Sequence, residues 1–254
     1  MLYLAFFVLG SIWGSFSNVC IYRIPNNKSV IINRSYCPKC KNKIGWFDNI
    51  PFLSFVLLKG KCRNCNKAIG LQYFIVELLS AISFVIIYHF YGISITSLLL
   101  LILSIYFIII FFIDLKHLII PNSLTFSLMF LGFIKSFDPN LDKTIFPNYI
   151  NSLIGGIFGY SIIWLIVFVY KKIRKKEGMG LGDAKLLGAI GFWFGWASIP
   201  FTIFLSSVAA LIFVIPSIIN KSRNMASQIP FGPYIIIGCI IYLIFLNEIK
   251  NILF

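Results

Sequence analysis

The class of fold is decided by one apolar stretch that ends on an acid, Leu98-Leu99-Leu100-Leu101-Ile102-Leu103-Ser104-Ile105-Tyr106-Phe107-Ile108-Ile109-Ile110-Phe111-Phe112-Ile113-Asp114. A helix of this length crosses most of a hydrocarbon layer about 30 Å thick. Apolar and polar residues do not alternate here, as they would in a strand of a membrane β-barrel. The stretch therefore predicts a membrane-spanning helix with a carboxylate at its end.

Similar apolar runs recur along the whole chain. Of its 254 residues, 59% are hydrophobic and only 12% are charged, and the mean hydropathy is +0.91, which is outside the range of soluble domains. No basic residue precedes the first run, so we expect a retained span and not a signal peptide. The composition predicts an all-α polytopic membrane protein with about eight transmembrane helices, at residues 2–22, 73–91, 95–113, 118–134, 148–170, 185–198, 199–219 and 231–247.

Basic residues are concentrated in alternate loops. The chain has 22 Lys and Arg against 8 Asp and Glu. They gather after the first, fifth and seventh runs, and the loops near 91–94 and 196–198 have none. By the positive-inside rule the N-terminus lies outside, and the cytoplasmic loops are 23–72, 114–117, 171–184 and 220–230. Loop topology and contact with anionic membrane lipid explain the net charge of +14 better than a nucleic-acid partner, so we expect none.

A second acid stands at the start of another apolar run. Asp183 closes Gly180-Leu181-Gly182-Asp183, and the predicted topology puts it at the cytoplasmic face together with Asp114. Two carboxylates within a few ångströms cannot both ionise easily, so the pKa of one rises and the pair shares a proton. The charged member can deprotonate a water while the protonated member polarises a carbonyl. Gly180 and Gly182 allow unusual backbone angles and close approach of another chain.

Simpler interpretations of these residues remain open. Asp183 fits a helix cap, and Asp114 fits an interfacial pair with Lys116. An ion- or proton-coupled transporter with a metal-stabilised cytoplasmic loop would also place acids beside spans. Three roles are open for Lys185: it tunes the aspartate pair, it binds a substrate carbonyl, or its side chain snorkels to the membrane interface. Glu77 suits a helix-start charge or a functional carboxylate.

Residues 23–72, here called the cysteine segment, contain two C-x-x-C pairs 21 residues apart. A tight turn of this spacing directs two sulfurs at one ion, and two such turns complete a tetrahedral zinc site. Disulfides are disfavoured in the reducing cytoplasm. Four sulfur ligands leave no position for water, so the zinc is expected to be structural. The predicted ligands are Cys37, Cys40, Cys62 and Cys65.

Five blocks of the chain, in order, resemble the type IV prepilin peptidases, which are intramembrane GxGD aspartic proteases. Gly178–Leu186 is similar to the second aspartate motif of this family and Asp114–Pro121 to the first. The other three blocks are an N-terminal signature, a stretch around the cysteine pairs, and a last block: Gly14–Pro25, Asp48–Glu77 and Ile229–Pro233.

The resemblance implies a multi-pass enzyme of the bacterial inner membrane. It implies cleavage of the short basic leader of prepilins or pseudopilins at the cytoplasmic face, with Asp114 and Asp183 as the catalytic dyad. Many members also N-methylate the new N-terminus with S-adenosylmethionine, an activity associated with the cysteine segment. The expected division is a first helix at 1–22, the cysteine segment, and a peptidase core at 73–254.

Two positions depart from the family pattern. Asn122 follows Pro121 where the family often has Asp, and Phe74 stands where Pro is common. No glycine-rich dinucleotide fingerprint is present, so the sequence does not place the S-adenosylmethionine site. A non-enzymatic pilus assembly factor, with the cysteine segment docking a partner, is a third hypothesis.

Overall fold

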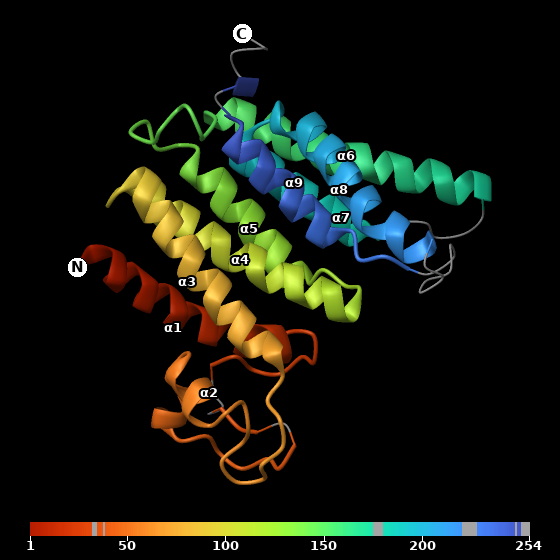
Figure 1. Cartoon of the computed structure of the whole chain (residues 1–254). Coiled ribbons are helices and arrows are strands. Elements are labelled where there is room, and N and C mark those ends of the chain that lie inside the picture. The colour runs from red at the N-terminus through yellow and green to blue at the C-terminus, as the bar shows by residue number, and fades with distance from the viewer. Residues whose placement is uncertain (32–34, 38, 175–179, 220–227, 247, 250–254) are drawn as a thin grey trace. The chain divides into compact units, whose positions relative to one another are not determined.

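The computed structural model describes all residues except 32–34, 38, 175–179, 220–227, 247 and 250–254. In the described residues the regular structure is helical, apart from two isolated β-bridges in the cysteine segment. This confirms the all-α class. The elements of Figure 1 are α1 (Leu2–Arg23), η1 (Trp46–Asn49), α2 (Leu53–Leu57), α3 (Leu71–Tyr91), α4 (Ile95–His117), α5 (Asn122–Lys135), α6 (Tyr149–Arg174), α7 (Leu181–Phe194), α8 (Ser198–Ile219) and α9 (Gly232–Ile244).

Within this described part, five helices are long and apolar enough to cross a membrane: α1, α3, α4, α6 and α8. The chain is therefore a multi-pass membrane protein. Helices α5, α7 and α9 have 14, 14 and 13 residues. These are shorter than the roughly 20 residues that a full crossing needs. The count of eight spans stays a prediction.

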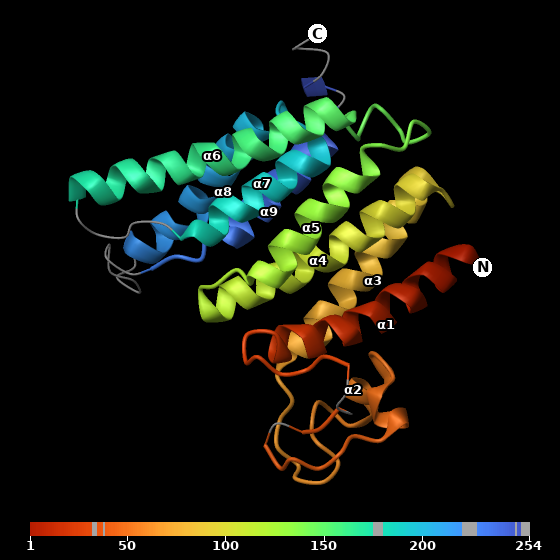
Figure 2. The ribbon, with the colours of Figure 1, turned by 180° about the vertical axis from the view of Figure 1, so that it is seen from behind.

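The chain divides into two compact units, Met1–Ile109 and Ile110–Phe254, and the boundary falls within α4. The predicted division at residues 22 and 72 stays a prediction. In the first unit α1 and α3 lie side by side and antiparallel, with the cysteine segment at the end where α1 stops and α3 starts (Figures 1 and 2). Glycines allow this close packing, because a Cβ at Gly10 would lie 2.7 Å from the carbonyl oxygen of Ser80.

In the second unit α7 packs against α5, α6 and α9, and α8 packs against α9 (Figure 2). Glycines again face the contact between α6 and α7. A Cβ at Gly155 would lie 2.5 Å from the carbonyl oxygen of Gly191, and one at Gly159 would lie 2.7 Å from that of Leu187. Trp193 is fully buried, and its Nε1–H donates to the carbonyl of Leu128 on α5 at 2.8 Å. Helix α7 is thus the centre of the unit, and its first turn carries Asp183.

Several predicted boundaries differ from the observed helices by up to about four residues, and the structure shows the cause of two of these differences. The span predicted at 118–134 begins only at Asn122, because Leu118 has φ 55° and its N–H caps α4 on the carbonyl of Asp114. The span predicted at 185–198 ends at Phe194, because Gly195 has φ 81° and leaves the helical region. Helix α8 begins at Ser198, so Pro200 lies in its first turn, where its missing N–H costs nothing.

Some predicted features lie outside the described residues. They include Gly178 and Met179 at the start of the second aspartate motif, and parts of the loops predicted at 171–184 and 220–230. The side of the membrane on which each loop lies stays a prediction.

Candidate active site and metal centre

Asp114 lies in the last turn of α4 and is buried, with 4% of its surface exposed. Its Oδ2 accepts the backbone N–H of Gly232 at 2.9 Å. Gly232 is the first residue of α9, where backbone N–H groups have no partner within the helix. The start of α9 therefore supplies a donor to the carboxylate of Asp114, across 118 residues of sequence.

Asp183 is the third residue of α7 and is also buried, with 8% of its surface exposed. Its backbone N–H donates to the carbonyl of Gly180 at 3.2 Å, as expected in a first turn. The helix has no side-chain cap, so the carboxylate of Asp183 does not cap it. The two carboxylates of Asp114 and Asp183 are close enough to interact electrostatically. The structure thus brings together the two acids that the sequence singled out.

The side chain of Ile120 lies close to both Gly182, which precedes Asp183, and Gly232, which donates to Asp114. A Cβ at Gly182 would lie 3.0 Å from the Cβ of Ile120, and one at Gly232 would lie 3.1 Å from its Cδ1. The same Cβ at Gly232 would lie 2.8 Å from Oδ2 of Asp114. Neither position has room for a side chain unless its neighbours move.

The predicted supporting residues fare differently. Gly182 does permit a close approach, but Gly180 has ordinary extended angles, with φ −77° and ψ 142°, and a Cβ there would make only ordinary van der Waals contacts at 3.8 Å. Neither has the unusual backbone angle that we expected, since among the described glycines positive φ occurs at 60, 92 and 195. The Nζ of Lys185 donates to Oδ1 of Asn122 at 2.6 Å. Lys185 therefore ties α7 to the start of α5.

In the first unit, the sulfur atoms of Cys37, Cys40, Cys62 and Cys65 all lie within 4.8 Å of one another. The Cys37–Cys65 and Cys40–Cys62 sulfur pairs are each 4.0 Å apart. A tetrahedral ion with bonds of about 2.3 Å to sulfur places its ligands slightly closer than this. The four residues that the sequence predicted therefore form a cluster able to hold a metal.

The two cysteine pairs have the same local structure. The N–H of Cys37 donates to the carbonyl of Asn42 and that of Cys62 to the carbonyl of Lys67. A β-bridge flanks each turn, and the fifth residue of each, Lys41 and Asn66, has φ 60° and 52°. Backbone N–H groups of Cys65 and Asn64 lower the pKa of the Cys62 thiol to about 7, which favours the thiolate that a metal needs. Each turn presents its sulfurs to the same point.

Glu77 lies on α3 and is buried, with 9% of its surface exposed. Its Oε2 accepts the N–H of Phe52 at 3.0 Å, and Phe52 has φ 60° at the start of α2. Glu77 therefore joins α3 to the cysteine segment within the first unit.

Comparison with known families agrees with this arrangement. Residues 101–215, which contain both aspartates, match the type IV leader peptidase family, and residues 8–91 match the bacterial peptidase A24 N-terminal domain. This chain belongs to the type IV leader peptidase family. The resemblance inferred from the five sequence blocks is confirmed.

Several curated relatives carry the name prepilin leader peptidase/N-methyltransferase. That of Vibrio cholerae is 38% identical over 93% of this chain and 94% of its own length. The relative from Neisseria gonorrhoeae is 36% identical over 92% and 88%, and that from Pseudomonas aeruginosa is 32% identical over 96% and 90%. No solved structure matches the chain significantly. These matches give the transporter hypothesis no support.

The sequence did not identify Gly232 as a donor to Asp114. The only available signal was the block Pro230-Phe231-Gly232-Pro233, which predicted a rigid turn near the cytoplasmic face. Pro233 does lie in the first turn of α9. Gly232, directly before this proline, has no side chain and so lets the carboxylate of Asp114 approach its backbone N–H.

Proposed function

We propose that this chain is a membrane aspartic endopeptidase that removes the leader of prepilins or pseudopilins and N-methylates the new N-terminus. Asp114 and Asp183 form the peptidase dyad. The observation that carries this proposal is that two buried carboxylates, from α4 and α7, lie within electrostatic range of each other in a chain of the leader peptidase family. Curated relatives that match nearly the full length carry both activities in their names.

The two acids suit different roles. The N–H of Gly232 stabilises negative charge on Asp114, because a hydrogen bond to a carboxylate is charge-assisted. Asp114 therefore fits the base that takes a proton from the attacking water. Asp183 lies beside that negative charge and fits the protonated acid that polarises the scissile carbonyl. Water attacks directly, so no acyl-enzyme forms.

The cysteine cluster fits one structural zinc ion. Four thiolates would close the coordination shell and staple a segment with little regular structure. Purified full-length protein is expected to contain about one zinc per chain, and Cys37→Ser or Cys62→Ser should remove it. Metal-free native protein that still folds and is active would contradict this role.

The charge pattern supports a protein of the bacterial inner membrane with the N-terminus outside and the dyad facing the cytoplasm. Alkaline phosphatase fused after Asp138 should be active, and the same reporter fused after Lys171 should be inactive. The opposite pattern would reverse the orientation.

Cleavage of a prepilin in membranes tests the peptidase. Asp114→Asn and Asp183→Asn should each abolish leader removal at unchanged protein abundance. The matched control is Asp138→Asn, whose carboxylate accepts, among the described residues, a local turn N–H from Asn140. It should cleave like the native protein. Normal cleavage by either dyad variant would refute the assignment.

A further inference from the structure

The cysteine segment leaves α1 at Arg23 and then returns along the side of that helix, so that α2 lies beside the middle of α1 (Figures 1 and 2). The ring of Phe52 stacks on that of Phe7, with the centroids 5.5 Å apart. The N–H of Phe52 donates to Glu77 of α3, whose Cα would lie 2.7 Å from a Cβ at Gly14 of α1. The start of α2 therefore contacts the part of the helix pair between Phe7 and Gly14.

This contact is far from the end of α1 at which the cysteine segment emerges. Gly14 lies about 14 Å from Arg23 along the helix axis, and Phe7 lies about 24 Å from it. Helix α1 is one of the five candidate spans, and its 22 residues make it only slightly longer than a hydrocarbon layer about 30 Å thick. Little of α1 can protrude from the membrane, so the contact with Phe52 falls at the depth of the hydrocarbon.

The side chains of α2 suit this depth. Leu53, Val56 and Leu57 are 53%, 66% and 71% exposed, although all three are large and apolar. No charged residue stands in the sequence between Ile50 and Leu58. Exposed apolar surface of this kind is unfavourable in water and favourable in hydrocarbon. The outer side of α2 is therefore matched to lipid and not to water.

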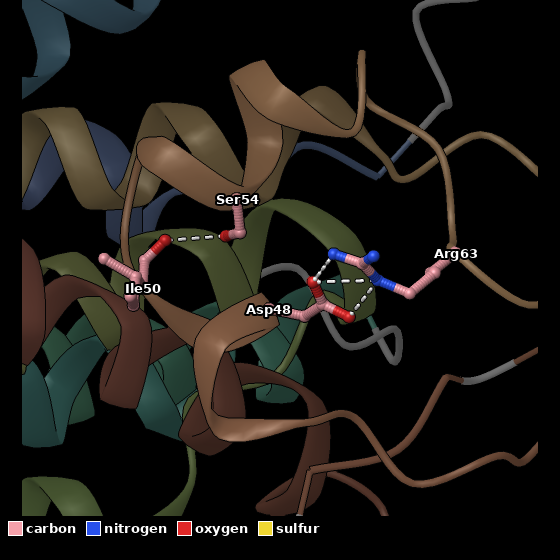
Figure 3. Close-up of polar contacts among 4 residues, drawn as sticks. All are labelled: Asp48, Ile50, Ser54 and Arg63. Carbon is pink, nitrogen blue, oxygen red and sulfur yellow. Dashed lines mark hydrogen bonds and ion pairs between the residues drawn. The ribbon is translucent and has the colours of Figure 1, made fainter.

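Backbone polar groups in hydrocarbon need partners within the protein. At the start of α2 the N–H of Phe52 donates to Glu77, and the preceding Pro51 has no N–H. The side chain of Ser54 is satisfied as well, because its hydroxyl donates to the carbonyl of Ile50 at 2.6 Å (Figure 3). Further backbone N–H groups that donate to carbonyls of the cysteine segment are those of Leu53, Ser54, Val56, Leu58, Lys59 and Gly60. These groups therefore need no water.

Charged residues flank this apolar stretch on both sides. Before it, Asp48 forms an ion pair with Arg63, Oδ1 to Nη2 at 2.7 Å, and the Arg63 side chain is 58% exposed (Figure 3). After it, Lys59 and Lys61 are exposed. Basic side chains suit the membrane surface, because their stems lie along apolar groups while their charges reach the headgroups. The pattern fits a chain that enters and leaves the apolar layer on the same side.

The exposed apolar surface of α2 continues that of α1. Val8, Ile12 and Phe16 of α1 are exposed, and together with Ile50 and Phe52 they line a groove of about 660 Å³. Exposed apolar side chains in the middle of a membrane-crossing helix face lipid. Acyl chains that contact this side of α1 therefore also reach the start of α2.

We propose that residues 50–58 form a re-entrant element, which dips into the membrane beside α1 and presents the exposed side chains of α2 to lipid acyl chains. The charge pattern predicts a cytoplasmic loop for this stretch only because basic residues surround it. Glu77 then has a structural role, since its carboxylate accepts the first N–H of α2 within the apolar layer. Because Cys62 follows closely, the element holds the cysteine cluster against the membrane surface. The proposal does not depend on either enzymatic activity.

Photocrosslinking of the full-length protein in phospholipid vesicles tests the proposal. An amino acid with a diazirine side chain replaces Leu57, and after illumination the mass of the product shows what the side chain contacted. A phospholipid adduct is expected, as it is when the same amino acid replaces Ile12 on the exposed face of α1. The matched control replaces Asn64, an exposed residue of the same segment, and should give no lipid adduct. Melting temperatures show whether each labelled protein is folded.

A fluorescent amino acid at the same positions measures depth. In place of Leu57 it should be quenched by phospholipids with brominated acyl chains and shielded from iodide in the water. In place of Asn64 the reverse is expected. Crosslinks from Leu57 to protein alone would show that a second copy or the other unit covers α2, and quenching like that at Asn64 would show that α2 faces water. Either result in a folded protein would overturn the proposal.

Discussion

At the residue scale, the site depends on one backbone donor. Asp114 is buried, and the N–H of Gly232 is its only hydrogen bond to another element among the described residues. The position has no room for a side chain, because a Cβ would lie 2.8 Å from Oδ2 of Asp114. Such a distance is below normal van der Waals contact, so a larger residue must displace the carboxylate.

Gly232→Ala should therefore lower the rate of leader cleavage about 10- to 100-fold, because a displacement of about 1 Å is enough to misplace a catalytic group. The measurement is the initial rate of cleavage in membranes. Gly180→Ala is the control, since a Cβ there would meet Asp183 only at 3.8 Å. The two alanine variants should differ clearly, and equal rates would contradict the role of Gly232.

A second residue-scale feature is a lysine buried beneath aromatic rings. Lys135 is 6% exposed, and its Nζ makes no hydrogen bond within the described part of the chain. The Nζ lies 4.1 Å from the ring centroid of Phe146 and 5.4 Å from that of Trp193. Contact with the rings offsets part of the cost of burying the ammonium group.

Lys135→Met should leave the melting temperature in detergent unchanged or raise it, because the apolar side chain fills the space without a buried charge. Lys135→Ala should lower stability by about 2 kcal/mol or more, because it leaves a cavity beside two rings. Thermal unfolding of both purified variants measures the difference. A Met variant as unstable as the Ala variant would show that the ammonium group is essential to the fold.

At the element scale, α7 is positioned by the close approach of α6. The contact is made by backbone atoms, since a Cβ added at Gly191 would collide with the carbonyl of Gly155. The hydroxyl of Ser152 also donates across this contact to the carbonyl of Phe192 at 2.7 Å. Because Asp183 is in the first turn of α7, the packing of α6 helps to fix the position of the second acid.

Gly191→Ala should push α6 and α7 apart and lower the free energy of unfolding by about 1–3 kcal/mol, with reduced cleavage. Gly70→Ala is a matched control for stability, because nothing lies within 4 Å of its added Cβ. Its backbone angles, φ −61° and ψ 137°, also suit alanine. Melting temperatures of the two variants should separate, and equal values would contradict tight packing at Gly191.

The same scale shows what the sequence could not predict. Apolar runs located the helices, but Leu118 at φ 55° delays the start of one, and Gly195 at φ 81° ends another earlier than predicted. A leucine rarely adopts such an angle, so no propensity rule marks that position. The pairing of Lys185 with Asn122 was also unpredictable, because their 63-residue separation carries no pattern. Contacts fixed by tertiary packing are invisible to local sequence rules.

At the scale of the whole molecule, the chemistry was more predictable than the geometry. Acids are rare in this chain, so Asp114 and Asp183 stood out, and the C-x-x-C spacing specified four ligands. Backbone donors such as Gly232 carry no comparable signal, because every residue except proline has an N–H group.

The whole account depends on Asp114 and Asp183 acting as one unit, and a double-mutant comparison tests this most directly. When two groups act together in one catalytic step, removing either one abolishes the contribution of both. The double variant therefore loses no more catalytic rate than either single variant. Purified Asp114→Asn, Asp183→Asn and the double variant should show the same background rate of prepilin cleavage, measured by the mass of the product. Near-native cleavage by either single variant, or losses that multiply in the double variant, would contradict a shared dyad.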